Sequence, residues 1–156
     1  MDIYNDEFLS LTSIFEKNQV KYLVIGGFAV NRYGYKRTTG DLDIYLKDTK
    51  ENRQNLIAAL EEIGYGRFDM LMDVPIVAGY CEILMDNGMY ADLMTEVKGL
   101  KQVDFEEHFS MATVDIVNEI PVRFLHFNHL IDNKKATGRS KDLLDIEELE
   151  KIRNNP

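Results

Sequence analysis

Residues 22–46 read YLVIGGFAVNRYGYKRTTGDLDIYL, and this stretch decides the fold. Its apolar start, YLVI, ends at Gly26-Gly27, which indicates a buried strand followed by a tight turn into a short helix. A second run, DLDIYL, reads as another strand, yet it begins with acidic residues that are costly to bury. Asp41 and Asp43 are two positions apart, so in a strand both carboxylates project from the same face.

Two carboxylates held side by side repel each other unless a cation lies between them. Mg²⁺ is the natural cation, because it is usually bound by one or two carboxylates together with substrate phosphates. A chain this rich in aspartate contains about one Asp-x-Asp pair by chance, so a solvated acidic turn is the alternative at Asp41 and Asp43. The turn at Gly26-Gly27 favours the metal hypothesis, since free backbone N–H groups at a strand-to-helix turn bind anions. A purely structural turn stays open there.

Composition sets the broad class of protein. The 156 residues suit a single domain spanning 1–156, with 45% hydrophobic and 29% charged residues. The net charge of −9 argues against general binding to nucleic acid or to an anionic membrane. The single cysteine, Cys81, excludes an internal disulfide, and the three histidines lack metal-ligand spacing. Without a signal peptide or a membrane-spanning apolar stretch, the sequence predicts a cytoplasmic protein.

Hydrophobic periodicity predicts an α/β (α+β) chain, a mixed sheet flanked by helices and followed by C-terminal helices. The pair Asp48 and Glu51 resembles a capping box, and Asn87-Gly88 is a strong hairpin signal. We expect helices over 5–18, 28–33, the segment from Asp48 to Ile63, 128–136 with Asn128 as N-cap, and 140–152 with Leu143, Ile146, Leu149 and Ile152 on one inward face. We expect strands over 21–26, 41–46, 80–86, 89–95 and 118–127, with 67–79 irregular or a further strand.

Two motifs in this order resemble the nucleotidyltransferase superfamily of the DNA polymerase beta type, and in particular small bacterial nucleotidyltransferase-like proteins. The first motif, G-G-x-A-V-x-x-x-G, starts at Gly26, and the second, R-x-T-x-D-L-D-I, comprises Arg37, Thr39, Asp41 and Asp43. The resemblance implies the nucleotidyltransferase fold with a third carboxylate on a later strand, and Asp92 in YADLMT fits that place. A solvent-facing position on an edge strand is the alternative for Asp92. Many members have serine where this chain has Gly27, so a phosphate contact through that hydroxyl is absent.

The tail KKATGRSKDLLD also resembles a signature of these proteins, K-x-A-T-G-R-x-K-D-L-x-D. It gathers Lys134, Lys135, Arg139 and Lys141 within eight residues of an acidic chain, where they could neutralise the charge of a triphosphate. Register with the family signature makes Lys135 the first candidate and Lys134 the second. The alternative is a scaffold of internal ion pairs or a solvated basic corner.

The resemblance implies a magnesium-dependent nucleotidyltransferase. Asp41, Asp43 and Asp92 would hold two Mg²⁺ ions, with Mn²⁺ as the other possible ion, and would be the catalytic residues. Gly26, Gly27, Arg37 and Thr39, with the basic tail, would bind the triphosphate of a nucleotide, expected to be ATP. The acceptor hydroxyl stays open, although the acidic charge makes nucleic acid a weaker candidate. The alternative is a non-catalytic nucleotide-binding or toxin–antitoxin module of the same fold, with a protein partner.

Overall fold

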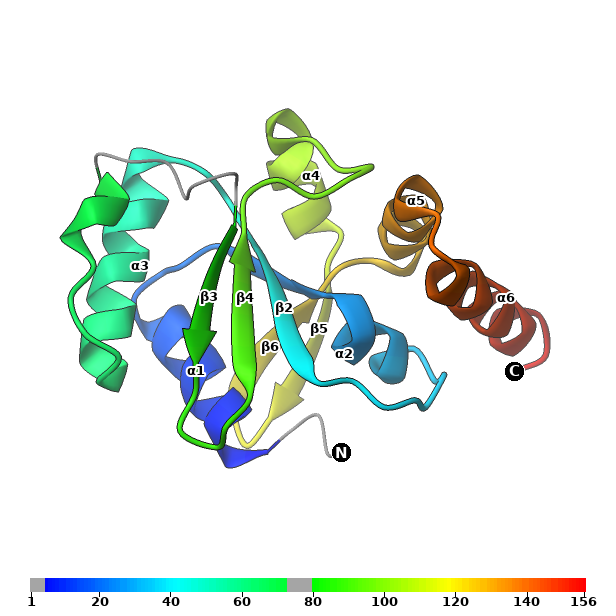
Figure 1. Ribbon diagram of the computed structural model, residues 1–156, viewed down its shortest axis with the longest axis horizontal. Helices are drawn as coiled ribbons and strands as arrows, with labels where there is room; N and C mark the ends of the chain where they lie inside the picture. The colour runs from blue at the N-terminus through cyan, green and yellow to red at the C-terminus, as the bar shows by residue number, and fades with distance from the viewer. Residues whose placement is uncertain (1–4, 73–79) are drawn as a thin grey trace.

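The computed structural model describes residues 5–72 and 80–156, which form a six-stranded mixed sheet with helices around it (Figure 1). The strands are β1 (Tyr22–Ile25), β2 (Asp41–Leu46), β3 (Tyr80–Leu84), β4 (Tyr90–Met94), β5 (Thr113–Val117) and β6 (Ile120–Phe124). The helices are α1 (Asp6–Lys17), α2 (Gly26–Arg32), α3 (Lys50–Ile63), α4 (Phe105–Ser110), α5 (Phe127–Thr137) and α6 (Ser140–Asn154). The predicted fold class is therefore confirmed. No described helix has the length and apolar character needed to cross a bilayer.

The strand order is β3-β4-β2-β1-β6-β5. At the centre, β1 and β2 are antiparallel, while β2 pairs in parallel with β4 and β1 in parallel with β6. The hairpins β3–β4 and β5–β6 form the two edges. Because β2 and β4 run in parallel and in register, their acidic residues lie at the same level of the sheet.

The alternation along β2 separates the core from the functional face. Leu42 and Ile44 are fully buried, whereas Asp41 is exposed and Asp43 is partly buried on the opposite face. On the core side, α1 packs against α3 and β6. The short helix α2 packs on β1 and β2, and α5 and α6 pack on each other beside it (Figure 1).

Two of the predicted helix caps are wrong. The side chain of Thr49, not Asp48, caps α3 by accepting a hydrogen bond from the backbone N–H of Asn52 at 3.1 Å. Asp48 instead forms an ion pair with Arg53 at 3.0 Å. At α5 the N-cap is His126, which accepts from the backbone N–H of residue 128 at 3.1 Å.

The predicted inward face of α6 is also wrong in part. Leu143 is 55% exposed and Ile152 is 37% exposed. Leu149 is buried as predicted, but the other buried residues of α6 are the aspartates Asp142 and Asp145. Two elements between 96 and 117, α4 and β5, were not expected from the sequence. The segment expected over 67–79 is a 3₁₀ turn at Asp69–Met72, and the rest of it lies outside the described residues.

Candidate active site

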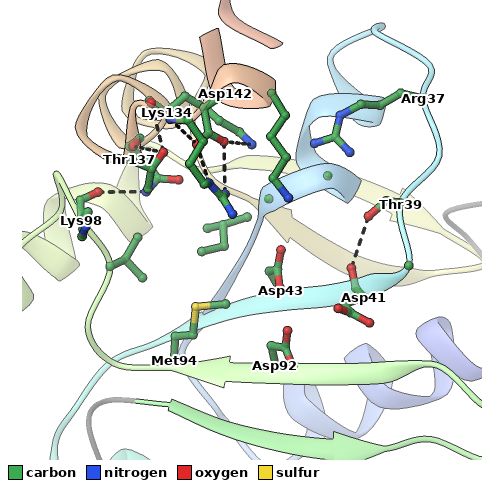
Figure 2. Close-up of a pocket in the computed structure, with 18 of the residues that line it drawn as sticks. Arg37, Thr39, Asp41, Asp43, Asp92, Met94, Lys98, Lys134, Thr137 and Asp142 are labelled. Atoms are coloured by element: carbon green, nitrogen blue, oxygen red, sulfur yellow. Dashed lines mark hydrogen bonds and ion pairs between the residues drawn. The ribbon is translucent and has the colours of Figure 1, made fainter. Parts of the chain in front are cut away.

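A pocket of about 680 Å³ lies where the sheet meets the C-terminal helices (Figure 2). Its floor comes from β2 and β4, one wall from the turn between β1 and α2 with residues 37–40, and the opposite wall from α5 and the start of α6. All of the predicted site residues except Lys135 line it. Lys135 is exposed on the outer side of α5, while its neighbour Lys134 faces the pocket.

The three predicted carboxylates line the floor of the same pocket. Asp43 and Asp92 are register partners across the parallel strands β2 and β4, and their side chains are in hydrogen-bonding contact. Burial, followed by the charge and hydrogen bond of Asp92, raises the pKa of Asp43 to about 7. Burial also raises the pKa of Asp92, which is 8% exposed. Asp41 is exposed, and its charge raises both values further.

The donor set at this floor fits a magnesium ion that shares its coordination with phosphate. Among residues 5–72 and 80–156, no three carboxylate, histidine or cysteine side chains form a complete metal-binding group by themselves. Mg²⁺ seldom needs one, because it is usually held by one or two carboxylates with substrate phosphates and water. Two buried like charges in contact, Asp43 and Asp92, require either a shared proton or a cation.

The glycine turn fits closely against the carboxylates. Gly26 has a positive φ of +66°, and a Cβ there would lie 2.0 Å from Oδ2 of Asp43. A Cβ on Gly27 would lie 2.4 Å from the hydroxyl oxygen of Thr39. Thr39 is 8% exposed, and its hydroxyl donates a hydrogen bond to the carbonyl oxygen of Asp41 at 3.4 Å. The Thr39 hydroxyl, from the segment just before β2, therefore occupies the space that a side chain at position 27 would need.

A second layer of polar groups extends the floor onto β3. Glu82, Asp92 and Asp43 are successive register partners across β3, β4 and β2, so they share one face of the sheet. The Tyr80 hydroxyl lies 2.9 Å from Oδ1 of Asp92 and 3.1 Å from Oε2 of Glu82. Burial and these two carboxylates raise the pKa of Tyr80, so its hydroxyl keeps the proton it shares with them. Tyr80 was not expected from the sequence, because only the hairpin register brings it to Asp92.

The basic wall is largely occupied by internal ion pairs. Lys134 is 4% exposed and lies 3.2 Å from Asp142 (Figure 2). It also lies 2.9 Å from Asp145. Asp145 also accepts two hydrogen bonds from Arg37, at 2.8 and 2.9 Å. Arg139 lies against Asp142 at 2.7 Å. These partners lower the pKa of Asp142 even though burial opposes them. Much of the predicted phosphate site is thus also a structural scaffold.

Two lysines on the pocket lining have no such partner among the described residues. Lys141, which the sequence identified, and Lys98, which it did not, are both exposed and make no side-chain hydrogen bond or ion pair in the described part of the chain. Lys98 follows β4, and its carbonyl accepts from Asn133 of α5 at 2.9 Å. No motif surrounds Lys98, so only the loop's path to α5 reveals it.

Comparison with known proteins gives a consistent result at the level of fold. No protein-family model matches the chain, and no curated protein matches it by sequence. A Thermotoga maritima protein assigned to the nucleotidyltransferases is 16% identical, with a TM-score of 0.54 over 94% of this chain and 89% of that one. The lincosamide antibiotic adenylyltransferase LnuA, solved with lincomycin bound, is 18% identical, with a TM-score of 0.57 over 95% of this chain and 97% of that one.

An antigenic nucleotidyltransferase-like protein from Paracoccidioides brasiliensis is 13% identical, with a TM-score of 0.52 over 95% of this chain and 76% of that one. The three structures agree with this one over nearly the whole chain; two are named as nucleotidyltransferases or nucleotidyltransferase-like, and the third as an adenylyltransferase. The chain therefore has the nucleotidyltransferase fold.

Proposed function

We propose that the chain is a magnesium-dependent nucleotidyltransferase that moves a nucleoside monophosphate from a nucleoside triphosphate to an acceptor hydroxyl and releases pyrophosphate. The observation that supports this most directly is the contact between Asp43 and Asp92 on the floor of a pocket whose wall is basic. A pair of buried carboxylates beside a glycine turn is costly for the free protein. It becomes favourable when a cation and phosphates are bound there.

In this proposal the three carboxylates divide two tasks. Asp41 and Asp43 would hold the metal that accompanies the triphosphate, and Asp92 would complete the metal site and accept the proton of the attacking hydroxyl. The bound magnesium would supply electrostatic stabilisation of the attacking and leaving oxygens. Asp92 suits the role of base because burial raises its pKa above the ordinary value.

The opposite wall would hold the phosphates. Gly26 and Gly27 line the pocket, where their backbone N–H groups would donate to phosphate oxygens. The exposed ammonium groups of Lys98 and Lys141 are available for the same oxygens. Lys134, Arg37 and Arg139 add positive charge while staying paired with the carboxylates of α6. Their pairing keeps the wall rigid before the nucleotide arrives.

ATP is the proposed nucleotide, and an adenylyl group is the proposed cargo. The similarity to an adenylyltransferase supports this choice. That neighbour acts on a lincosamide antibiotic, so a small hydroxyl-bearing molecule is one class of acceptor to test. The chain's acidic charge makes nucleic acid a weaker choice.

One observation favours the alternative, a module that binds a nucleotide or a partner protein without turnover, as in a toxin–antitoxin pair. Three of the basic groups on the pocket wall, Arg37, Lys134 and Arg139, are already paired with Asp142 or Asp145. This pairing reduces the positive charge available to stabilise a transition state, a requirement that a binding module does not have.

Calorimetric titration of ATP with and without MgCl₂ tests the proposal. We expect binding by the wild type to require Mg²⁺, and the Asp43→Asn variant to lose that requirement together with most of its affinity. Asp69→Asn is the matched control, because it makes the same charge change at an exposed position outside the pocket. Magnesium-dependent binding retained in Asp43→Asn would rule out the metal site.

Transfer is tested separately with ATP labelled at the α-phosphate, added to the purified protein with cell extract. Label that moves to an extract component in a magnesium-dependent manner supports the transferase. Binding without any transfer of label supports the non-catalytic alternative.

A further inference from the structure

The acceptor hydroxyl of a nucleotidyl transfer must lie within hydrogen-bonding distance of the base that takes its proton. In the proposed function that base is Asp92. Among the described residues, one side-chain hydroxyl meets this condition: the Tyr80 oxygen lies 2.9 Å from Oδ1 of Asp92. The protein's own chain thus places a hydroxyl where an acceptor is required.

The position of Tyr80 leaves it accessible. It is the first residue of the edge strand β3, and it is 44% exposed. Glu82, which shares the same face of β3, holds the hydroxyl from the other side at 3.1 Å. A side chain that is accessible yet held against a carboxylate at a fixed distance is oriented for reaction, because little motion remains to be lost.

Other hydroxyls near the site lack this arrangement. Thr39 is 8% exposed, and its hydroxyl contacts the carbonyl of Asp41. Tyr90 is 40% exposed and lies on β4, but its hydroxyl has no hydrogen bond to Asp92 within the described residues. Among the described residues, Tyr90 therefore matches Tyr80 in residue type and accessibility but lacks the hydrogen bonds to Asp92 and Glu82 that hold the Tyr80 hydroxyl.

We propose that Tyr80 is a self-modification site, so that the protein transfers a nucleoside monophosphate onto its own tyrosine. The inference rests on the proposed function. The Tyr80 oxygen attacks the α-phosphorus of the nucleoside triphosphate, and the bond from that phosphorus to the oxygen bridging to the next phosphate breaks. Pyrophosphate leaves with the bond's electron pair, and the proton of Tyr80 passes to Asp92. The product is a phosphodiester between the Tyr80 oxygen and the nucleoside.

Each chain can carry only one nucleoside monophosphate at Tyr80. Once esterified, the Tyr80 oxygen has no proton to donate, and its nucleotide stays next to Asp92. Because β3 and β4 are paired within one chain, the reaction is intramolecular. Its rate constant should not change when the protein is diluted at a fixed nucleotide concentration.

In the experiment, the 156-residue protein is incubated with MgCl₂ and each of the four ribonucleoside triphosphates labelled at the α-phosphate, without another acceptor. The label on the protein is quantified on denaturing gels and located by tandem mass spectrometry. Tyr80→Phe and Tyr90→Phe are compared with the wild type. Magnesium-dependent ATP binding is measured on all three proteins, which also shows that each variant keeps a folded pocket.

We expect up to one label per chain, located at Tyr80, retained in Tyr90→Phe and lost to background in Tyr80→Phe. Label at another residue, or label that persists in Tyr80→Phe, would overturn the proposal. So would a wild type that binds ATP with magnesium but acquires no label, and the proposed function would survive that outcome. A wild type that neither binds ATP with magnesium nor transfers label would overturn both.

Discussion

Asp43 and Asp92 face each other across the parallel pairing of β2 with β4, their carboxylates in contact and largely withdrawn from water. This one relationship links the fold to the proposed chemistry. The parallel register between two strands that are far apart in sequence is what brings the side chains together. Like charges in such contact destabilise the free protein, and a function that neutralises them explains why the fold would keep them.

Replacing Asp43 with asparagine should therefore stabilise the metal-free protein. At about pH 8, above the pKa of about 7 of Asp43, we expect the free energy of unfolding in EDTA to rise by about 1–2 kcal/mol, because one of two repelling carboxylates is removed. Urea denaturation with and without MgCl₂ measures this. Added magnesium should stabilise the wild type and leave Asp43→Asn unchanged. A variant less stable than the wild type in EDTA would contradict the repulsion.

A methyl group at Gly26 should displace the Asp43 carboxylate from its position in the site. Gly26→Ala would place its Cβ 2.0 Å from Oδ2 of Asp43 and would hold alanine at a φ of +66°. We expect a loss of about 1–2 kcal/mol in unfolding free energy from the left-handed backbone alone, together with loss of magnesium-dependent ATP binding. Denaturation and calorimetry provide the two measurements.

Gly40→Ala is the control for that substitution. Gly40 also lines the pocket, yet a Cβ there would meet nothing within 4 Å, and its φ is not in the left-handed region. Both measurements should stay close to the wild type. Equal effects of the two substitutions would show that the crowding at Asp43 is unimportant.

Local signals explain how much of the fold could be predicted from the sequence. The strand, glycine turn and second strand over 22–46 were predicted because each is marked by residues within it. The strand β5, TVDIV, alternates between half-buried and exposed positions at the edge of the sheet, but its apolar residues Val114 and Ile116 are on the exposed side. Hydrophobic alternation therefore does not mark a buried face in this short segment. The helix α4 has six residues, too few for a helical period to be recognised.

Polar contacts between distant elements explain which features of the site could not be predicted from the sequence. Hydrophobic periodicity placed the apolar residues of α6 inward, but Asp142 and Asp145 are the ones buried, because they meet Lys134 and Arg37 from other elements. Which lysine of α5 faces the pocket depends on the rotation of that helix, and the family signature favoured Lys135 instead. Such pairings leave no periodic pattern in the sequence.

Loss of the Lys134 ammonium should destabilise the protein, because it removes the ion pairs that join α5 to α6 in the pocket wall. Lys134→Met leaves Asp142 and Asp145, which are 0% and 1% exposed, without their shared buried partner. We expect a loss of about 3–5 kcal/mol in unfolding free energy, as when one partner of a buried ion pair is removed. Urea denaturation measures the change.

Lys135→Met is the matched control, since it removes the same charge one residue further along α5 at an exposed position. Its effect should stay within about 0.5 kcal/mol. A large effect at Lys135 with a small one at Lys134 would contradict the ion-pair scaffold and restore the prediction made from the sequence.

The packing of the three histidines predicts a specific pH dependence. The rings of His108 and His126 lie 4.4 and 5.6 Å from that of His129. Burial, and then the charges of His108 and His126, lower the pKa of His129, while Asp132 and Glu107 oppose the shift. Below the ordinary histidine pKa of about 6.5, the unfolded chain therefore binds more protons at this residue than the native chain, and stability falls as the pH falls.

His129→Gln removes this titration, so the variant should gain stability relative to the wild type when the pH is lowered from about 8 to about 5. Paired urea denaturations of the two proteins at each pH measure the difference. Asp43 titrates in the same range but is present in both proteins, and because its contribution is the same in each, it cancels from the comparison. A difference that stays constant with pH would mean that the packed His129 ring titrates as it does in the unfolded chain.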